Sequence, residues 1–219
     1  MRLPTGHAMR HSVKRPVKRG FTLIEALVAL AILAVVLSIG MPRMSAWIYA
    51  GKVAAAGQFY AEGFALARNQ ALTQNGTSRL VLVTNADNGQ FDWRIDICFP
   101  RPDAPCNDIS DNWSSASAVA SGDPKGDTGF KSLLRRADAL PSAAELAQTT
   151  GEDDPRAVYF TPLGWVDSSV APRIERIDMK PVGKHASAAP ETAVVLTLAG
   201  NTIRCRPLAA STDPYRCPP

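Results

Sequence analysis

The hydrophobic pattern begins with one long apolar run near the N-terminus. The 21 residues from Phe21 to Met41 are apolar or small except for one threonine, one glutamate and one serine. As a helix this run would be about 30 Å long, which matches the hydrocarbon core of a bilayer. The run therefore predicts a membrane-spanning helix over residues 21–41.

A helical pattern with a single apolar face continues beyond this run. Its apolar residues recur every three or four positions: Val53, Ala56, Tyr60, Phe64, Ala67 and Ala71. This spacing predicts a helix packed against a globular domain, and Asn75-Gly76 favours its end. Residues 21–74 would then form one helix about 80 Å long. A bend is expected at Gly40 and Pro42, because proline removes a backbone hydrogen bond and clashes with the preceding turn.

The rest of the chain has short runs typical of β-strands. The first two runs flank a hairpin signal at 85–89, and the expected strands are residues 77–84, 91–99, 156–166, 173–180, 191–198 and 202–207. Residues 130–140 predict either a short helix or an edge segment. Residues 100–129, rich in Ser, Asp, Gly and Pro, predict a long surface loop. A long helix followed by antiparallel strands gives the fold class α+β.

The formal charge of +4 is unevenly distributed along the chain. Six of the 24 Lys and Arg residues lie before Phe21, where there is no acidic residue. Without residues 1–20, 18 bases face 20 acids, a net charge of −2. The basic flank predicts a cytoplasmic N-terminus with the remainder of the chain outside. Overall charge gives no reason to expect nucleic-acid binding.

Glu25 conflicts with a simple membrane anchor. A lone carboxylate near the centre of a membrane helix costs roughly 2.5 kcal/mol or more, so it indicates a function and a partner of opposite charge. A secretory signal peptide is disfavoured, because Met41-Pro42-Arg43 leads into more helix without a small-residue cleavage site. An uncleaved anchor would leave the carboxylate unexplained.

The stretch RGFTLIEALVALAILAVVLSIGMP resembles the N-terminus of type IV prepilins and type II secretion pseudopilins. Gly20 corresponds to the residue before the cut, Phe21 to the new N-terminus, Glu25 to the fifth processed residue and Pro42 to the twenty-second. In that family a membrane aspartyl peptidase cleaves after the glycine and methylates the new amine. The glutamate then pairs with the amine of a neighbouring subunit. Such pairing in low dielectric would relieve both charges.

The resemblance implies a leader over residues 1–20 and a pilin helix over 21–74. It also implies a pilin fold, in which the helix packs on a periplasmic, β-sandwich-like domain over residues 75–219. The expected partners are other pilin or pseudopilin subunits, the prepilin peptidase and the inner membrane, which a single helix would span. The leader is long for this family, so the chain could begin at Met1 or at Met9.

Later segments resemble the FimT/GspH group of these proteins. AEGFALARNQALTQNGTSRLVLV is similar to that group's helix end and first strand, and VYFTPLGWV is similar to a later strand. The resemblance implies a FimT-like minor pilin of a type IV pilus, acting in assembly or initiation at the tip. The alternative is a GspH-like pseudopilin of a type II secretion system. A DNA receptor for natural transformation is a third interpretation, compatible with the first.

Four cysteines, Cys98, Cys106, Cys205 and Cys217, lie on the expected exported side. Three pairings are possible. We favour Cys98–Cys106 and Cys205–Cys217, because each closes a short segment otherwise poor in apolar anchors. Zinc is disfavoured because no CxxC spacing occurs.

No arrangement of residues suggests catalysis. After the leader the chain has one histidine, His185, which we expect in a solvated loop. Glu152-Asp153-Asp154-Pro155 is typical of a turn. The sequence therefore predicts no enzyme activity, no metal and no cofactor.

The C-terminal segment is locally basic. Some FimT-type pilins bind DNA through a C-terminal Gly-Arg-x-Arg motif. Here Arg204-Cys205-Arg206 keeps the Arg-x-Arg spacing, but three residues separate it from Gly200. Alternate strand residues share one face, so Arg204 and Arg206 could both reach phosphates, with Arg216 nearby. An ordinary solvated face is the other interpretation.

Cleavage after Gly20 is the first testable prediction. Co-expression with a prepilin peptidase should shorten the chain by about 2 kDa, at ~110 Da per residue. A bulky residue in place of Gly20 should block the cleavage, because the peptidase must fit that position closely. Intact mass spectrometry measures both outcomes. An uncleaved leader beside an active peptidase would contradict the prepilin interpretation.

Overall fold

The structure is a computed structural model that describes residues 20–218. Most of the expected leader, and with it the choice between Met1 and Met9, lies outside the described residues. Helix α1 spans Leu23–Gln74. Thr22 caps it, because its Oγ1 accepts a hydrogen bond of 3.2 Å from the backbone N–H of Glu25.

The chain divides into two compact units, residues 1–42 and residues 43–219. Helix α1 contributes to both and is uninterrupted at Gly40 and Pro42. The expected bend there stays a prediction. In the first unit, residues 20–38, Gly40 and Met41 are all exposed.

The end of α1 follows from its sequence. Asn75 adopts the left-handed conformation, with φ of 50°, and the N–H of Gly76 donates to the carbonyl of Ala71 at 3.2 Å. Asparagine tolerates this conformation because its short polar side chain can bond locally. The arrangement uses a carbonyl that the last helical turn leaves free.

Short strands make up most of the second unit. The elements after α1 are β1 Thr77–Thr84, β2 Phe91–Cys98, the 3₁₀ turn η1 Gly126–Thr128, β3 Leu133–Arg135, β4 Leu146–Thr149, β5 Ala157–Phe160, β6 Arg176–Pro181, the 3₁₀ turn η2 Gly183–His185, β7 Thr192–Leu196 and β8 Thr202–Cys205. They form two four-stranded sheets with the orders β3-β2-β1-β5 and β4-β6-β7-β8. All strand pairs are antiparallel.

The chain segment before β6 links the two sheets. The N–H of Ile174 donates to the carbonyl of Ala157 in β5 at 2.9 Å. One residue later, the carbonyl of Glu175 accepts from the N–H of Leu196 in β7 at 2.8 Å. The chain therefore leaves the edge of the first sheet and enters the second within two residues.

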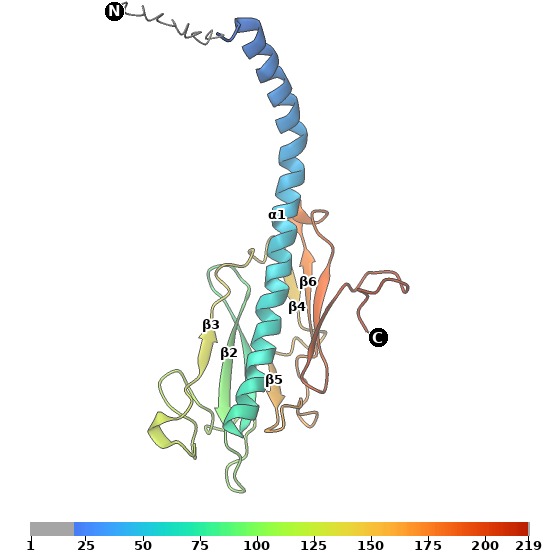
Figure 1. Cartoon of the computed structure of the whole chain (residues 1–219). Helices are drawn as coiled ribbons and strands as arrows, with labels where there is room; N and C mark the ends of the chain where they lie inside the picture. Colours follow the sequence, from blue (N-terminus) through green and yellow to red (C-terminus); the bar gives the residue numbers. More distant parts are fainter. Residues whose placement is uncertain (1–19, 219) are drawn as a thin grey trace, which may run out of the picture. The chain divides into compact units, whose positions relative to one another are not determined.

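One hydrophobic core joins the second half of α1 to both sheets (Figure 1). Alternate residues of β1 and β2 point to the helix, which explains their apolar and polar alternation. The core includes Tyr60 and Phe64 from α1, Leu80 and Trp93 from the first sheet, and Ile177, Met179 and Val194 from the second. The predicted α+β fold, a long N-terminal helix packed on antiparallel sheets, is confirmed.

Two strands differ from the sequence-based expectation. Leu146–Thr149 was not expected as a strand, because alanine, glutamine and a lone leucine have little β-preference. Its pairing with β6, and the hydrogen bond from Tyr60 Oη to Gln148 Oε1 at 2.8 Å, hold it in place. The run 156–166 is shorter than expected, because Thr161 and Trp165 close a turn in which Gly164 has φ of +74°.

Gly63 allows α1 to approach the first sheet closely. A Cβ at this position would lie 2.9 Å from Leu80 Cδ1 and 3.2 Å from the ring of Trp93. Gly63→Ala should therefore lower the free energy of unfolding by about 1–3 kcal/mol through overpacking. Urea unfolding of the detergent-solubilised chain, followed by near-UV circular dichroism, measures the change.

Gly51→Ala is the matched control, because Gly51 is helical and a Cβ there meets nothing within 4 Å. Alanine favours the helix over glycine by up to about 1 kcal/mol, so this variant should be neutral or slightly more stable. Equal responses of the two variants would contradict the close approach at Gly63.

Candidate functional site

Glu25 stands in the first turn of α1 on an exposed apolar surface. Its backbone N–H bonds to Thr22, while its carboxylate has no hydrogen bond or ion pair among residues 20–218. An acidic side chain suits the positive end of the helix dipole. Phe21, the expected new N-terminus, precedes this turn and is 80% exposed. The carboxylate is therefore free to pair with a charge from outside the chain.

The C-terminal arginines lie beside the second half of α1. In the register of β7 and β8, Arg204 stands opposite Val194, a core residue, so Arg204 is on the helix-facing side of the second sheet. Its Cδ lies 3.6 Å from where a Cβ of Gly57 would be. Arg204 and Arg206 both line a groove of about 580 Å³ between this stretch of α1 and β8. Arg204 and Arg206 therefore lie on the same side of β8, where both line this groove.

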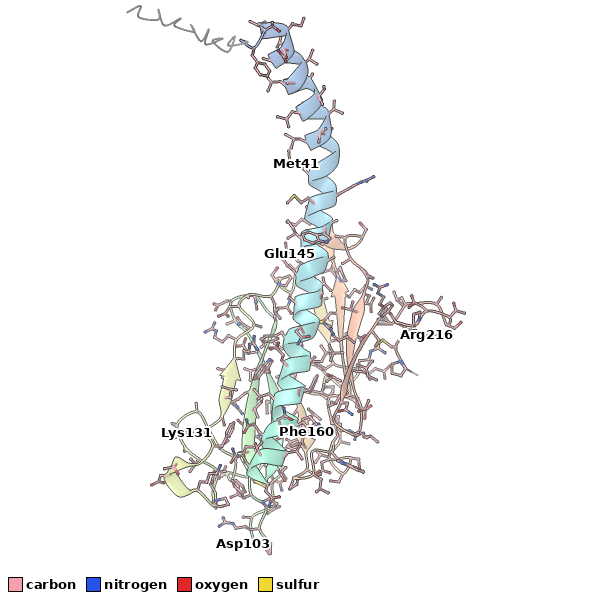
Figure 2. All side chains as sticks on the ribbon, viewed as in Figure 1. Met41, Asp103, Lys131, Glu145, Phe160 and Arg216 are labelled. Atoms are coloured by element: carbon pink, nitrogen blue, oxygen red, sulfur yellow. A yellow bond between two sulfur atoms is a disulfide. The ribbon has the colours of Figure 1, made fainter. Side chains whose placement is uncertain are left out.

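The third arginine is next to this groove and not part of its lining. The backbone of Arg216 pairs with that of Arg206 in a parallel bridge. Around this bridge, Arg206 N–H donates to the carbonyl of Tyr215 at 2.7 Å and Cys217 N–H donates to the carbonyl of Arg206 at 3.3 Å. Figure 2 shows Arg216 on the C-terminal segment beyond the second sheet.

The charges of these arginines are not neutralised by carboxylates within the described residues. Neither Arg204 nor Arg216 has a side-chain hydrogen bond or ion pair in residues 20–218, and the guanidinium of Arg206 lies 5.4 Å from the ring of Tyr215. The Cys205–Cys217 disulfide fastens the segment that carries Arg216 to the end of β8. The positive charge of the segment is therefore available to a ligand.

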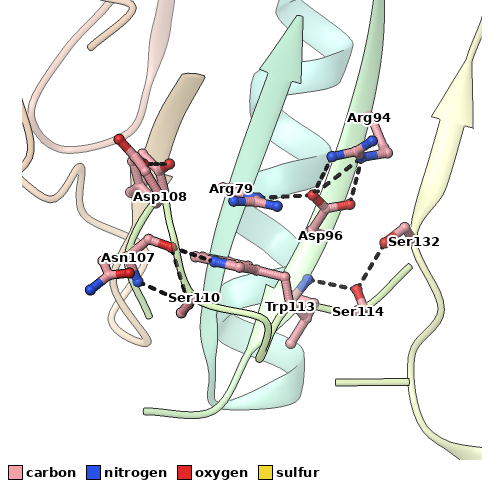
Figure 3. A network of polar contacts seen from close by, with 11 residues as sticks. Arg79, Arg94, Asp96, Asn107, Asp108, Ser110, Trp113, Ser114 and Ser132 are labelled. Atoms are coloured by element: carbon pink, nitrogen blue, oxygen red, sulfur yellow. Dashed lines mark hydrogen bonds and ion pairs between the residues drawn. The ribbon is translucent and has the colours of Figure 1, made fainter. Parts of the chain in front are cut away.

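A second polar cluster occupies the outer face of the first sheet (Figure 3). The carboxylate of Asp96 is fully buried and binds two guanidiniums, Arg79 Nε at 2.8 Å and Arg94 Nε at 2.9 Å. The guanidinium of Arg79 also lies 4.3 Å from the ring of Trp113, which belongs to the expected surface loop 100–129. Unlike the C-terminal arginines, these two already have a carboxylate partner.

The same loop is fastened to the sheet at several further points. Cys98 at the end of β2 forms a disulfide with Cys106. Ser114 exchanges two hydrogen bonds with Ile97, its N–H donating at 2.8 Å and its Oγ accepting at 2.9 Å. The hydroxyl of Tyr159 bonds to the Asp108 carboxylate. The cluster therefore holds a polar loop in place on the sheet.

Burial raises the pKa of two buried tyrosines in this unit. Burial, with the nearby Asp108 carboxylate, raises the pKa of Tyr159 to about 12. Burial also raises the pKa of Tyr60, whose hydroxyl bonds to the carbonyl of Phe91 and to Gln148. Both hydroxyls remain hydrogen-bond donors at neutral pH.

His185 differs from the expectation of a solvated loop. Its ring stacks on that of Tyr49, with 4.0 Å between ring centroids, and its side chain is only 23% exposed. Its Nε2 lies 3.5 Å from a carboxylate oxygen of Glu145. The prediction of a solvated loop was wrong, because no residue near His185 in the sequence indicates its contact with Tyr49 of α1. Within residues 20–218, no group of three or more His, Cys, Asp or Glu side chains is placed to hold a metal ion.

Sequence reasoning overlooked Asp96 and Trp113. One signal was present, because Asp92, Arg94 and Asp96 alternate with apolar residues in β2 and therefore share a face. Trp113 is the only aromatic residue in 100–129, which marks it as an anchor for that loop. The partner Arg79 lies on another strand, so the cluster itself could not be read from local sequence.

Comparison with known proteins identifies the N-terminal segment. Residues 15–41 match the family described as the prokaryotic N-terminal methylation motif. The minor pseudopilin EpsH from the type 2 secretion system of Vibrio cholerae is similar in structure, with 11% sequence identity and a TM-score of 0.34. The similarity covers 72% of this chain and 99% of EpsH. Curated proteins gave no significant match.

The methylation motif and the observed architecture occur together in this chain. They combine an N-terminal methylation signal with an exposed apolar helix that continues into a domain of antiparallel sheets. This combination agrees with the expected pilin or pseudopilin architecture, and the family match itself covers residues 15–41. The apolar helix is long enough to cross a membrane, which indicates membrane anchoring.

Proposed function

We propose that this chain is a FimT-like minor pilin that assembles through Glu25. The leader 1–20 is removed after Gly20, the amine of Phe21 is methylated, and residues 21–41 span the inner membrane with the domain in the periplasm. The subunit then packs into the initiating or tip complex of a type IV pilus. The observation that carries the proposal is the carboxylate of Glu25, which has no partner among residues 20–218 and stands on an exposed apolar helix within a methylation motif.

The energetic argument concerns what Glu25 can bind. In hydrocarbon a lone carboxylate is unfavourable, and pairing it with a positive charge offsets much of that cost. The amine of a neighbouring processed subunit is a cation available in the same layer of the membrane. A subunit docked in this way is more stable in lipid than an isolated one, which favours assembly over dispersal.

A GspH-like pseudopilin of a type II secretion system is the alternative within the same class. It would use the same leader, helix and carboxylate. The helix end and first strand resemble the FimT/GspH group as a whole and do not separate the two. We favour the pilus subunit because the C-terminal segment keeps an Arg-x-Arg spacing.

DNA binding is a second candidate function, supported by C-terminal arginines whose charge no carboxylate within the described residues pairs with. Arg204 and Arg216 lack carboxylate partners within the described residues, whereas Arg79 and Arg94 share one. Residues 155–219 hold eight bases and five acids, while 103–154 hold four bases and ten acids. DNA would therefore approach the C-terminal side and avoid the acidic loops. With so few contacts, binding would be weak and insensitive to base sequence.

The Glu25→Ala variant tests the assembly role. It should insert and be cleaved normally, because it removes the unfavourable group from the lone helix. It should fail to enter pili in a strain that lacks the wild-type copy, as measured by immunoblot of sheared pili. Glu62→Ala is the matched control, since Glu62 lies on the same helix and pairs with Arg135 in the second unit. Normal incorporation of Glu25→Ala would disprove the charge-pairing role.

The triple variant Arg204→Ala, Arg206→Ala and Arg216→Ala tests the DNA interface. The detergent-solubilised processed chain should shift duplex DNA at low salt, and each lost contact should reduce the slope of log K against log salt by roughly 0.9. Reduction of Cys205–Cys217 should also weaken binding by releasing Arg216. Arg101→Ala is the control, because Arg101 lies at the start of the acidic loop. Equal retardation of wild type and triple variant, or none at low salt, would leave these arginines as a solvated face.

A further inference from the structure

Helix α1 exposes three large apolar side chains where it begins to pack on the domain. Met44 is 62%, Trp47 76% and Ile48 45% exposed. Their spacing of three and four residues places them on one side of the helix. An exposed tryptophan with two large apolar neighbours on a helix indicates a surface that is covered by something outside the chain.

The opposite side of the same turns is already covered by the domain. Tyr49 is 3% and Val53 2% exposed. The hydroxyl of Tyr49 donates to the carbonyl of Glu145 at 2.6 Å, and its ring stacks on His185. Trp47 and Tyr49 are two residues apart, so the exposed side and the domain contact begin on the same turn.

The exposed side of α1 changes character further along the second unit. Gln58 and Asn69 are exposed there and Glu62 is half-buried, so the side opposite the core becomes polar. Between Glu25 and Glu62 the sequence has no acidic residue. The apolar segment that contains Trp47 is instead flanked by two bases, Arg43 and Lys52.

We propose that the face formed by Met44, Trp47 and Ile48 lies in the headgroup region of the outer leaflet and anchors the domain to the membrane surface. This inference rests on the membrane anchoring in the proposed function. Trp47 follows Phe21 by 26 residues, which is about 39 Å of helix. A bilayer with its headgroups measures about 40–45 Å, and tryptophan favours its interfaces.

Charge and continuity favour lipid over a protein partner for this face. The three residues follow the apolar run 21–41 closely in the sequence, within the same helical element. Arg43 and Lys52 suit anionic headgroups and have no carboxylate partner within residues 20–218.

Tryptophan quenching in proteoliposomes tests this placement. The full-length chain is reconstituted into vesicles of phosphatidylethanolamine and phosphatidylglycerol, with bromine placed either near the headgroups or near the chain ends. Trp47 should be quenched more by the shallow bromine than by the deep one. The Trp47→Phe variant should lose this quenching.

Trp165→Phe is the matched control, because Trp165 is 62% exposed but lies in the turn after β5. This variant should keep the bromine quenching of the wild type. Aqueous iodide should quench Trp165 and spare Trp47 in vesicles. The remaining tryptophans, Trp93 and Trp113, are buried and common to both variants.

Two results would overturn the inference while leaving the anchor intact. If the chain resists alkaline extraction but Trp47 is open to iodide and insensitive to bromine, the face lies in water. If Trp47 is shielded from iodide yet insensitive to bromine, protein covers the face. Release of the chain by alkaline carbonate would instead reject the membrane anchoring itself.

Discussion

The packing of one face of α1 on both sheets is the contact on which the domain depends. Each sheet has only four strands, several of them three to five residues long, and neither has another described layer to cover its apolar face. The helix supplies that cover through aromatic residues such as Tyr60 and Phe64, each contributing about 1.5–3 kcal/mol by its burial. Gly63 lets the helix come close, and the Tyr60 hydroxyl reaches a strand from each sheet.

The side chains of α1 change character over three successive stretches of the helix. Residues 21–41 are apolar or small except for Thr22, Glu25 and Ser38, a composition that suits a lipid environment. Around Trp47 one side is apolar and exposed while the other packs on the domain. From Gln58 onward most large apolar side chains face the core, with Leu72 as an exposed exception. Under the proposed function, the Glu25 carboxylate, which has no partner among residues 20–218, would be unfavourable in lipid for an isolated subunit and would therefore favour assembly.

Two sets of arginines differ in whether a buried carboxylate pairs with their charge. Arg79 and Arg94 share the buried carboxylate of Asp96, and removing that carboxylate would leave two guanidiniums unpaired. They serve to fasten the loop that contains Trp113. Arg204 and Arg216 sit on an edge strand and a disulfide-bonded tail without such a partner in the described residues. Composition alone treats all four arginines alike.

The sequence by itself determined the elements whose signals are local. The apolar run, its lone glutamate and the methylation motif are contiguous, and Asn75-Gly76 ends the helix by its own backbone preference. The alternation in β1 and β2 likewise predicted their hairpin. Only the tertiary structure decided that Leu146–Thr149 is a strand, that His185 stacks on Tyr49 and that Asp96 binds Arg79. Each of these depends on partners distant in the chain, and local preference carries no information about which distant group supplies a hydrogen bond or a packing surface.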